Sequence, residues 1–336
     1  MAEAVDAAKR RAEMLEHDER DYDAFIANAN LLVSQRDLGV TEELLEAFRE
    51  VAARLEREHP WEIENLTWTH YHIAVCFRGL GYLNEALLSQ QRATDMAQQY
   101  LDLDAREAQI HNLGNQYKAL GNVQRAEELY REALALADES NNPLWKANHL
   151  ACLAGCAQSQ GRFDEALQHI AQAIELRIRI GDLGGYARNT REQSGVFLTI
   201  GEIDSALDAA ARAYEQARDL KRPLREYCRA WAEARLAQGK AAEAYRLLME
   251  PTDDQPGARW DFDNVLGTVL LCLRRPEAAQ QAFARALEQS EVWLSRSNEN
   301  PGARSDKAAA LAGLAVCGQA DSLLRAKEAY RAAIRA

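Results

Sequence analysis

A glycine recurs at a constant interval of 40 residues through the middle of the chain, and similar residues follow it each time. The four segments are GYLNEALLSQQRA from Gly81, GNVQRAEELYREA from Gly121, GRFDEALQHIAQA from Gly161 and GEIDSALDAAARA from Gly201. A constant interval over four copies indicates tandem repeats, in which each unit buries its apolar face by stacking on its neighbours. The chain is therefore predicted to form a repeat array.

Each repeat is predicted to consist of two helices separated by the glycine. In the second copy, Ile110, Leu113 and Tyr117 recur at helical spacing before Gly121, and apolar residues from Val123 onward do the same after it. Glycine adopts positive φ readily, so it suits the point where one helix ends and the chain reverses. Only 7 prolines occur in 336 residues, and strong helix formers dominate. We therefore expect an all-α fold.

The repeated residues resemble the consensus of the tetratricopeptide repeat family. Its pattern of small, large and aromatic positions is matched by Leu113, Gly114, Tyr117, Gly121, Ala126, Tyr130 and Ala133, and again by Leu266, Gly267, Leu270, Ala279, Phe283 and Ala286. The 40-residue unit is similar to the long repeats of LGN-type polarity adaptors and of bacterial STAND ATPase sensor regions. This resemblance implies a right-handed α-solenoid, a TPR-like superhelix of about seven antiparallel helix pairs.

The repeats divide the chain into four predicted parts. Residues 1–20 form a charged tail or helix, residues 21–60 a degenerate capping pair, residues 61–250 the core repeats, and residues 251–336 the C-terminal repeats. Terminal repeats of solenoids are atypical because they form caps. Two polar segments that contain proline, Pro251–Trp260 and Ser297–Asp306, are expected to be loops.

Charge and hydropathy argue against several classes of function. The formal net charge is −12, the opposite of the basic surface that nucleic-acid binding requires. The sequence contains no run of eighteen apolar residues, so it predicts no membrane span, and the first twenty residues have no apolar signal-peptide core.

The scattered cysteines are more typical of reduced thiols in a cytoplasm than of a disulfide framework. The excess of arginine over lysine and the many alanines are typical of a GC-rich bacterial source.

In the tetratricopeptide family the first helix of each pair lines a concave groove, so the resemblance implies a binding surface there. The candidate residues lie off the packing face of the first helices and are Tyr71, Arg78, His111, Asn112, Asn115, Lys118, Asn148, Arg188, Arg191 and Arg229. Five are cationic, and asparagine amides both donate to and accept from a peptide backbone. We therefore expect a protein or peptide partner with acidic residues.

An alternative is that the arginines pair with acidic residues of adjacent helices, such as Glu192, Glu226 and Glu233. The candidate set also lacks the Lys/Asn/Arg carboxylate clamp of the chaperone-binding members of the family. It therefore does not predict binding of an EEVD-type C-terminus.

No residue pattern indicates a metal site or catalysis. His70 and His72 are two apart on a helix, so their side chains point away from each other. Cys152 and Cys156 share a helix face, but Cys156 and Cys76 precede their glycines by the same interval, which is typical of a packing position. G-x-S-x-G, Walker A, H-E-x-x-H and C-x-x-C motifs are absent from the sequence. We expect no catalytic residue, metal or cofactor.

The predicted function is a non-catalytic scaffold or adaptor that holds an acidic segment in its groove. A second hypothesis is a sensor module that controls an NTPase or a protease, as in STAND proteins and protease-regulating repeat proteins, or a small-peptide receptor of the Rap kind. A third is a nucleic-acid-binding α-solenoid, which the acidic net charge disfavours.

Overall fold

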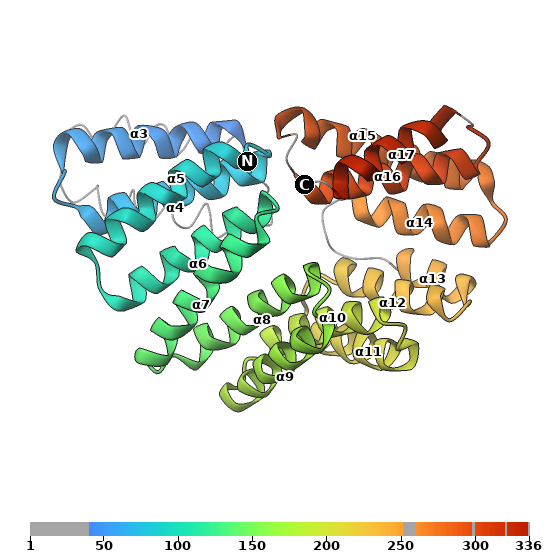
Figure 1. Ribbon diagram of the computed structural model, residues 1–336, viewed down its shortest axis with the longest axis horizontal. Coiled ribbons are helices and arrows are strands. Elements are labelled where there is room, and N and C mark those ends of the chain that lie inside the picture. The colour runs from blue at the N-terminus through green and yellow to red at the C-terminus, as the bar shows by residue number, and fades with distance from the viewer. Residues whose placement is uncertain (1–39, 251–259, 298–299, 320, 335–336) are drawn as a thin grey trace. The chain divides into compact units, whose positions relative to one another are not determined.

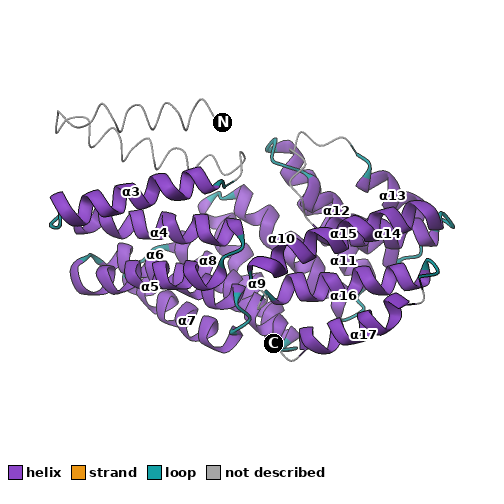
Figure 2. Ribbon diagram, turned by 90° about the horizontal axis from the view of Figure 1, so that it is seen from above, coloured by secondary structure: helices purple, strands orange, loops and turns teal. Residues whose placement is uncertain are grey.

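The computed structural model describes residues 40–250, 260–297, 300–319 and 321–334. Over these ranges it contains fifteen helices and no strand (Figures 1 and 2). The predicted tail at residues 1–20, residues 21–39 of the predicted capping pair, and residues 251–259 of the predicted first loop lie outside the described residues. The all-α prediction is confirmed for the described part of the chain.

The chain forms two compact units, an N-terminal unit up to Leu120 and a C-terminal unit from Gly121. The N-terminal unit contains α3 (Glu42–Glu58), α4 (Ile63–Leu80), α5 (Leu83–Tyr100) and α6 (Leu103–Ala119). The C-terminal unit contains α7 (Val123–Glu139), α8 (Pro143–Ser159), α9 (Phe163–Ile180), α10 (Leu183–Thr199), α11 (Ile203–Asp219), α12 (Arg225–Ala237), α13 (Ala241–Leu248), α14 (Trp260–Cys272), α15 (Pro276–Arg296), α16 (Pro301–Val316) and α17 (Asp321–Ile334).

The four evenly spaced glycines lie where the sequence places them, between a first helix and a second helix. Their φ angles are +92° at Gly81, +84° at Gly121, +75° at Gly161 and +83° at Gly201, all in the left-handed region. At Gly161 and Gly201 an added Cβ would meet nothing within 4 Å, so backbone conformation, not space, requires glycine there. The predicted turns are confirmed.

Buried alanines allow the two helices of a pair to approach closely. Ala86, Ala126, Ala166 and Ala206 occupy the same position in successive second helices, and each is completely buried. In the C-terminal unit the first helices also contact one another, α10 with α12, α12 with α14 and α14 with α16, whereas no two described second helices are in comparable contact. The first helices of this unit therefore form one layer and the second helices another.

The prediction of a loop over Ser297–Asp306 is wrong for the second half of this segment. Helix α16 begins at Pro301, so residues 301–306 are helical. The side chain of Asn300 accepts a hydrogen bond from the Ala303 N–H at 3.0 Å and caps the helix. Proline is tolerated in the first turn because its missing N–H has no acceptor there. The polar residues that suggested a loop therefore form the start of a helix.

No described helix is both long and apolar enough to cross a lipid bilayer.

Candidate functional site

All ten predicted groove residues lie on first helices, in two groups. The N-terminal unit holds Tyr71 and Arg78 on α4 and His111, Asn112, Asn115 and Lys118 on α6. The C-terminal unit holds Asn148 on α8, Arg188 and Arg191 on α10 and Arg229 on α12.

His111 lies among positive charges in the N-terminal unit. Burial, together with the charges of Arg78 and Lys118, lowers the pKa of His111 from 6.5 to about 4. Its imidazole is therefore neutral at pH 7. The structure thus brings together three of the six predicted residues of this unit, one from α4 and two from α6.

The other three residues of this group have mixed surroundings. Tyr71 packs against the core of the unit, with its ring centroid 5.7 Å from that of Trp68 and 5.0 Å from that of His72. Asn112 and Asn115 are half-buried on α6. Much of the Tyr71 ring therefore serves packing, while the asparagines keep part of their surface exposed.

We predict that His111 makes the stability of the protein depend on pH. The folded state has the lower pKa, so the unfolded state binds the extra proton between pH 6.5 and about 4. This contribution is fully present above pH 6.5 and is lost as the pH falls to about 4, by about 1–3 kcal/mol. Urea unfolding from pH 7.5 to 4 should show a shallower loss for His111→Gln than for the wild type. Parallel curves for the two proteins would contradict the assignment.

In the C-terminal unit, two of the three predicted arginines form ion pairs with acidic neighbours. Arg229 lies 2.7 Å from Glu233 and 3.4 Å from Glu226. Arg191 lies 3.8 Å from both Glu192 and Glu226. The predicted alternative, pairing with an acidic residue of an adjacent helix, is therefore found for Arg191, whose partner Glu226 lies on α12. Both partners of Arg229 lie on its own helix.

Arg188 and Asn148 differ from these two arginines. Arg188 is exposed on α10, and its charge helps to lower the pKa of the Asp182 carboxyl. Asn148 is half-buried, and its side-chain oxygen accepts a hydrogen bond from Arg177. Asn148 thus has a structural contact, whereas Arg188 presents its charge to solvent.

Arg177 is a structural side chain of this region that the sequence does not single out. It lies near the end of α9, is 1% exposed, and donates to Asn148 of α8 and to Asp182, which caps α10. A Cβ on Gly185 would lie closer than 3.0 Å to Arg177, so the glycine leaves room for the guanidinium. The sequence signal is the Gly184–Gly185 pair in the first turn of a helix, where glycine is otherwise unfavourable.

His70, His72, Cys76 and Cys156 occupy packing positions. His70 is buried, with its Nε2 3.5 Å from Glu56 Oε1, whereas His72 stacks on Phe48 at 5.2 Å between ring centroids. Cys76 and Cys156 are completely buried, and burial raises the pKa of the Cys76 thiol to about 12. Within the described ranges no three His, Cys, Asp or Glu side chains are grouped so that they could hold a metal ion.

Parts of this chain are similar in sequence to known proteins. Residues 110–140 and 145–219 match the sequence profile of the tetratricopeptide repeat. Tetratricopeptide repeat protein 29 of Trypanosoma brucei brucei is 26% identical over 136 residues, which are 40% of this chain and 28% of that protein. The chain thus matches less than a third of the length of this relative.

Two solved structures have a similar fold. The apo form of RapI gives a TM-score of 0.56 at 12% identity, over 87% of this chain and 97% of that one. Aspartyl phosphate phosphatase F from Bacillus subtilis gives 0.57 at 13% identity, over 80% and 69%. At these identities the likeness concerns the fold alone. Together with the paired helices and the glycine turns, the two matched segments show that this chain contains tetratricopeptide repeats within residues 110–219.

Proposed function

We propose that this protein, which contains tetratricopeptide repeats, is a non-catalytic scaffold that holds an acidic peptide or protein segment on its first helices. Tetratricopeptide repeats are protein-interaction modules, and the acidic character of the partner is our specific addition. The observation that carries it is the exposed Arg188 one turn of α10 away from the half-buried Arg191. In this proposal the protein acts in the cytoplasm.

The ion pairs of Arg191 leave it available to a ligand. Both distances are 3.8 Å, longer than a hydrogen bond, so the guanidinium holds its carboxylates only by charge. Such pairs near the surface contribute about 0–1 kcal/mol, and exchange for a ligand carboxylate costs little. Arg188 would be the first contact for an acidic segment, and Arg191 would hold it bidentately. Arg229, at 2.7 Å from Glu233, stays within the protein.

The polar first-helix residues of the N-terminal unit would serve the same class of ligand. Asn112 and Asn115 are half-buried one turn apart on α6, and each amide can pair with a peptide N–H or C=O. Arg78 and Lys118 supply positive charge near His111, the residue that precedes Asn112 on α6. This supports a backbone-binding role for the asparagines and a steering role for the cations.

Charge reversal tests the proposal. Peptides selected from a displayed random library on the wild type should be rich in Asp and Glu. The double variant Arg188→Glu with Arg191→Glu should bind them about tenfold more weakly or worse, because each acidic side chain then faces repulsion. Fluorescence polarisation of labelled peptides measures the affinity.

The matched control is Arg212→Glu with Arg218→Glu, which reverses two exposed charges on the second helix α11. Its net charge equals that of the test variant, so long-range repulsion is the same. Equal weakening in both variants, or selection of peptides without acidic residues, would refute the proposed site.

A further inference from the structure

Helices α3, α4 and α5 of the N-terminal unit flank an open hollow of about 330 Å³. From α4, which packs against both other helices, His70, Ile73 and Phe77 face the hollow at helical spacing. The other lining residues are Arg49, Ala52, Ala53 and Glu56 on α3, and Leu88, Ser89 and Arg92 on α5. A volume of this size lies at the lower end of the range, roughly 300–1,000 Å³, in which proteins bind small molecules.

Donors outnumber acceptors among the ionisable side chains of this hollow. Arg49, Arg92 and His70 supply N–H groups, whereas Glu56 supplies the carboxylate. One oxygen of that carboxylate, Oε1, lies 3.5 Å from His70 Nε2 and 3.5 Å from Arg92 Nη2. Both distances exceed the usual N–H···O hydrogen-bond range of about 2.7–3.2 Å, so a single oxygen serves two donors weakly. The lining therefore favours a further anionic acceptor.

Neither arginine of the lining is held by a strong internal bond. Arg49 stands over the Phe77 ring, with its Cζ 5.0 Å from the ring centroid, and its Nη1 lies 3.4 Å from Glu46, which is outside the lining. The side chains of Arg49 and Glu46 are 51% and 60% exposed, and that of Arg92 is 66% exposed. Exposed pairs of this kind contribute about 0–1 kcal/mol. Both guanidinium groups can therefore turn to a ligand at little cost.

His70 distinguishes this hollow from a depression of the solvated surface. The residue is 5% exposed, so its imidazole is a buried polar group within the lining. Burial, together with the charge of Arg92, lowers the pKa of His70, and the ring is neutral at pH 7. A few fixed polar groups beside apolar side chains are what orients a ligand in a binding pocket.

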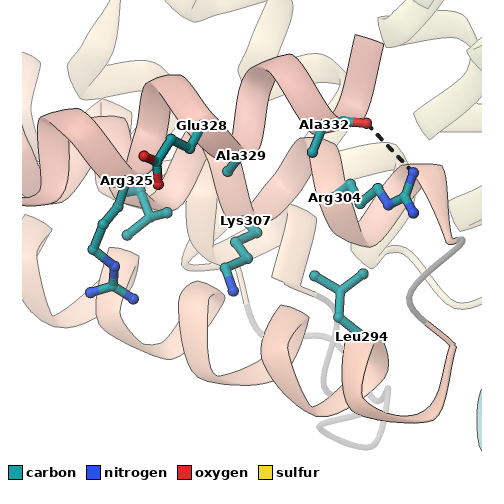
Figure 3. Close-up of a pocket in the computed structure, with 8 residues that line it drawn as sticks. Leu294, Arg304, Lys307, Arg325, Glu328, Ala329 and Ala332 are labelled. Atoms are coloured by element: carbon teal, nitrogen blue, oxygen red, sulfur yellow. Dashed lines mark hydrogen bonds between the residues drawn. The ribbon is translucent and has the colours of Figure 1, made fainter. Parts of the chain in front are cut away.

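A hollow of about 450 Å³ in the C-terminal unit lacks this feature (Figure 3). It lies among α15, α16 and α17, and its charged lining residues are Arg304, Lys307, Arg325 and Glu328. None of these four is buried. Lys307 Nζ also lies 2.9 Å from Glu291 Oε1, a normal hydrogen-bond distance. This second hollow therefore serves as an internal control for the first.

We propose that the hollow of α3, α4 and α5 binds a small, free aromatic carboxylic acid. With His70 neutral, the lining carries two positive charges and one negative charge, which one ligand carboxylate balances. Arg49 and Arg92 would donate to this carboxylate, because charge-assisted bonds are shorter and stronger than their present long pairs. The aromatic ring would lie against Ile73 and extend the stack that Arg49 forms on Phe77.

The size of the hollow favours a free molecule over a segment of a partner protein. A helix is about 10–12 Å across with its side chains and does not fit into 330 Å³. No side chain of the standard amino acids carries both an aromatic ring and a carboxylate. A protein could therefore supply both groups only through an aromatic residue at its C-terminus, and the experiment includes that case.

Calorimetric titration of the full chain at pH 7.5 tests the site with three probes. They are 2-naphthoate, 2-naphthamide, and the peptide Gly-Gly-Phe with a free C-terminus. We expect naphthoate to bind, and the amide, which has the same shape without the charge, to bind about tenfold more weakly or worse. The peptide chain extends beyond the hollow, so the peptide should also bind at least about tenfold more weakly than naphthoate.

Variants locate the bound acid. Arg49→Gln and Arg92→Gln should each weaken naphthoate about tenfold, and Ala53→Leu, at an exposed position of α3, should abolish binding by filling the hollow. Two controls should leave the affinity unchanged. Arg57→Gln removes an exposed charge of α3 outside the lining, and Lys307→Gln removes a charge from the hollow of the C-terminal unit. Urea unfolding of each variant checks that it is folded.

Three results would overturn the proposal. They are no binding of naphthoate at up to about 1 mM, equal binding of naphthamide or of the peptide, and equal affinities of Arg49→Gln and Arg57→Gln. Charge reversal at Arg188 and Arg191 should leave naphthoate binding unchanged. This site and the proposed scaffold function therefore stand or fail independently.

Discussion

Replacing Arg177 by alanine is expected to lower the free energy of unfolding by about 3–5 kcal/mol. Arg177 is 1% exposed and joins three helices, since it donates to Asn148 of α8 and to the capping Asp182 of α10 from its own position on α9. Removal of one partner of a buried ion pair leaves the other charge poorly solvated. The truncation also opens a cavity among helices that depend on close packing.

The measurement is urea unfolding, combined with hydrogen exchange over residues 143–199. Local exchange is measured because unfolding of a chain with two compact units is not guaranteed to be two-state, and a single global midpoint would then hide the change. Exchange should accelerate at the junction of α8, α9 and α10. Unchanged protection at this junction in Arg177→Ala would contradict the structural role.

Asp182 gives the same junction a defined pH dependence. Burial raises the pKa of Asp182, but the Gly185 N–H and the Arg177 guanidinium together outweigh it, so the pKa is lowered. Stability from a carboxyl with a lowered pKa is present above its unfolded pKa, near 4, and is lost as the pH falls through the folded value. Arg177→Ala should therefore remove part of the acid sensitivity as well as the stability.

Two neighbouring glycines provide a matched pair of controls for this junction. A Cβ on Gly185 would meet Arg177 along its buried stem, whereas a Cβ on Gly184 would meet only the end of the exposed Arg222 side chain. Gly184→Ala should therefore be neutral or stabilising by up to about 1 kcal/mol, because alanine favours helices. Gly185→Ala should destabilise the protein.

The 40-residue period of the sequence predicts where the turns lie. It does not predict which charged side chains pair with one another. Positive φ at Gly81, Gly121, Gly161 and Gly201 follows from what a helix-to-helix reversal requires of any chain. Whether Arg191 meets Glu226 or solvent depends on rotamers and on differences of a few ångströms between helices. Periodicity does not determine such differences, so the sequence left both pairings open.

Segments rich in Gly, Pro, Ser and Asn occur both in loops and at helix starts. This explains why a loop was wrongly predicted at residues 301–306. The same residue types form loops and begin helices, because both need side-chain oxygens and a fixed φ. Asn300 accepts a hydrogen bond from the Ala303 N–H at the helix start, and Pro301 has no N–H that would need an acceptor there. Arg177 escaped prediction for a related reason, since an arginine near the end of a helix ordinarily faces solvent and complements the dipole.

The second large effect is expected at Phe283 of α15, whose ring is 3% exposed and lies between two glycines. A Cβ on Gly267 of α14 would lie 2.7 Å from the ring, and one on Gly313 of α16 would lie 2.5 Å from it. The ring therefore packs directly on the backbones of two first helices. Phe283→Ala should lower the free energy of unfolding by about 3–5 kcal/mol, through lost burial and the cavity that remains.

A double-mutant cycle separates this contact from a general intolerance of helical substitutions. Gly313→Ala alone should cost about 1–3 kcal/mol, because the ring, held by α14 on its other side, cannot move away. Gly195→Ala is the control, since an added Cβ there meets nothing within 4 Å and should leave stability unchanged or raise it. In the Phe283→Ala background the methyl group of Gly313→Ala has space, so its cost should disappear or become a gain. Additive effects in urea unfolding would mean that the ring and Gly313 are not in contact, because only residues that share a contact couple in this way.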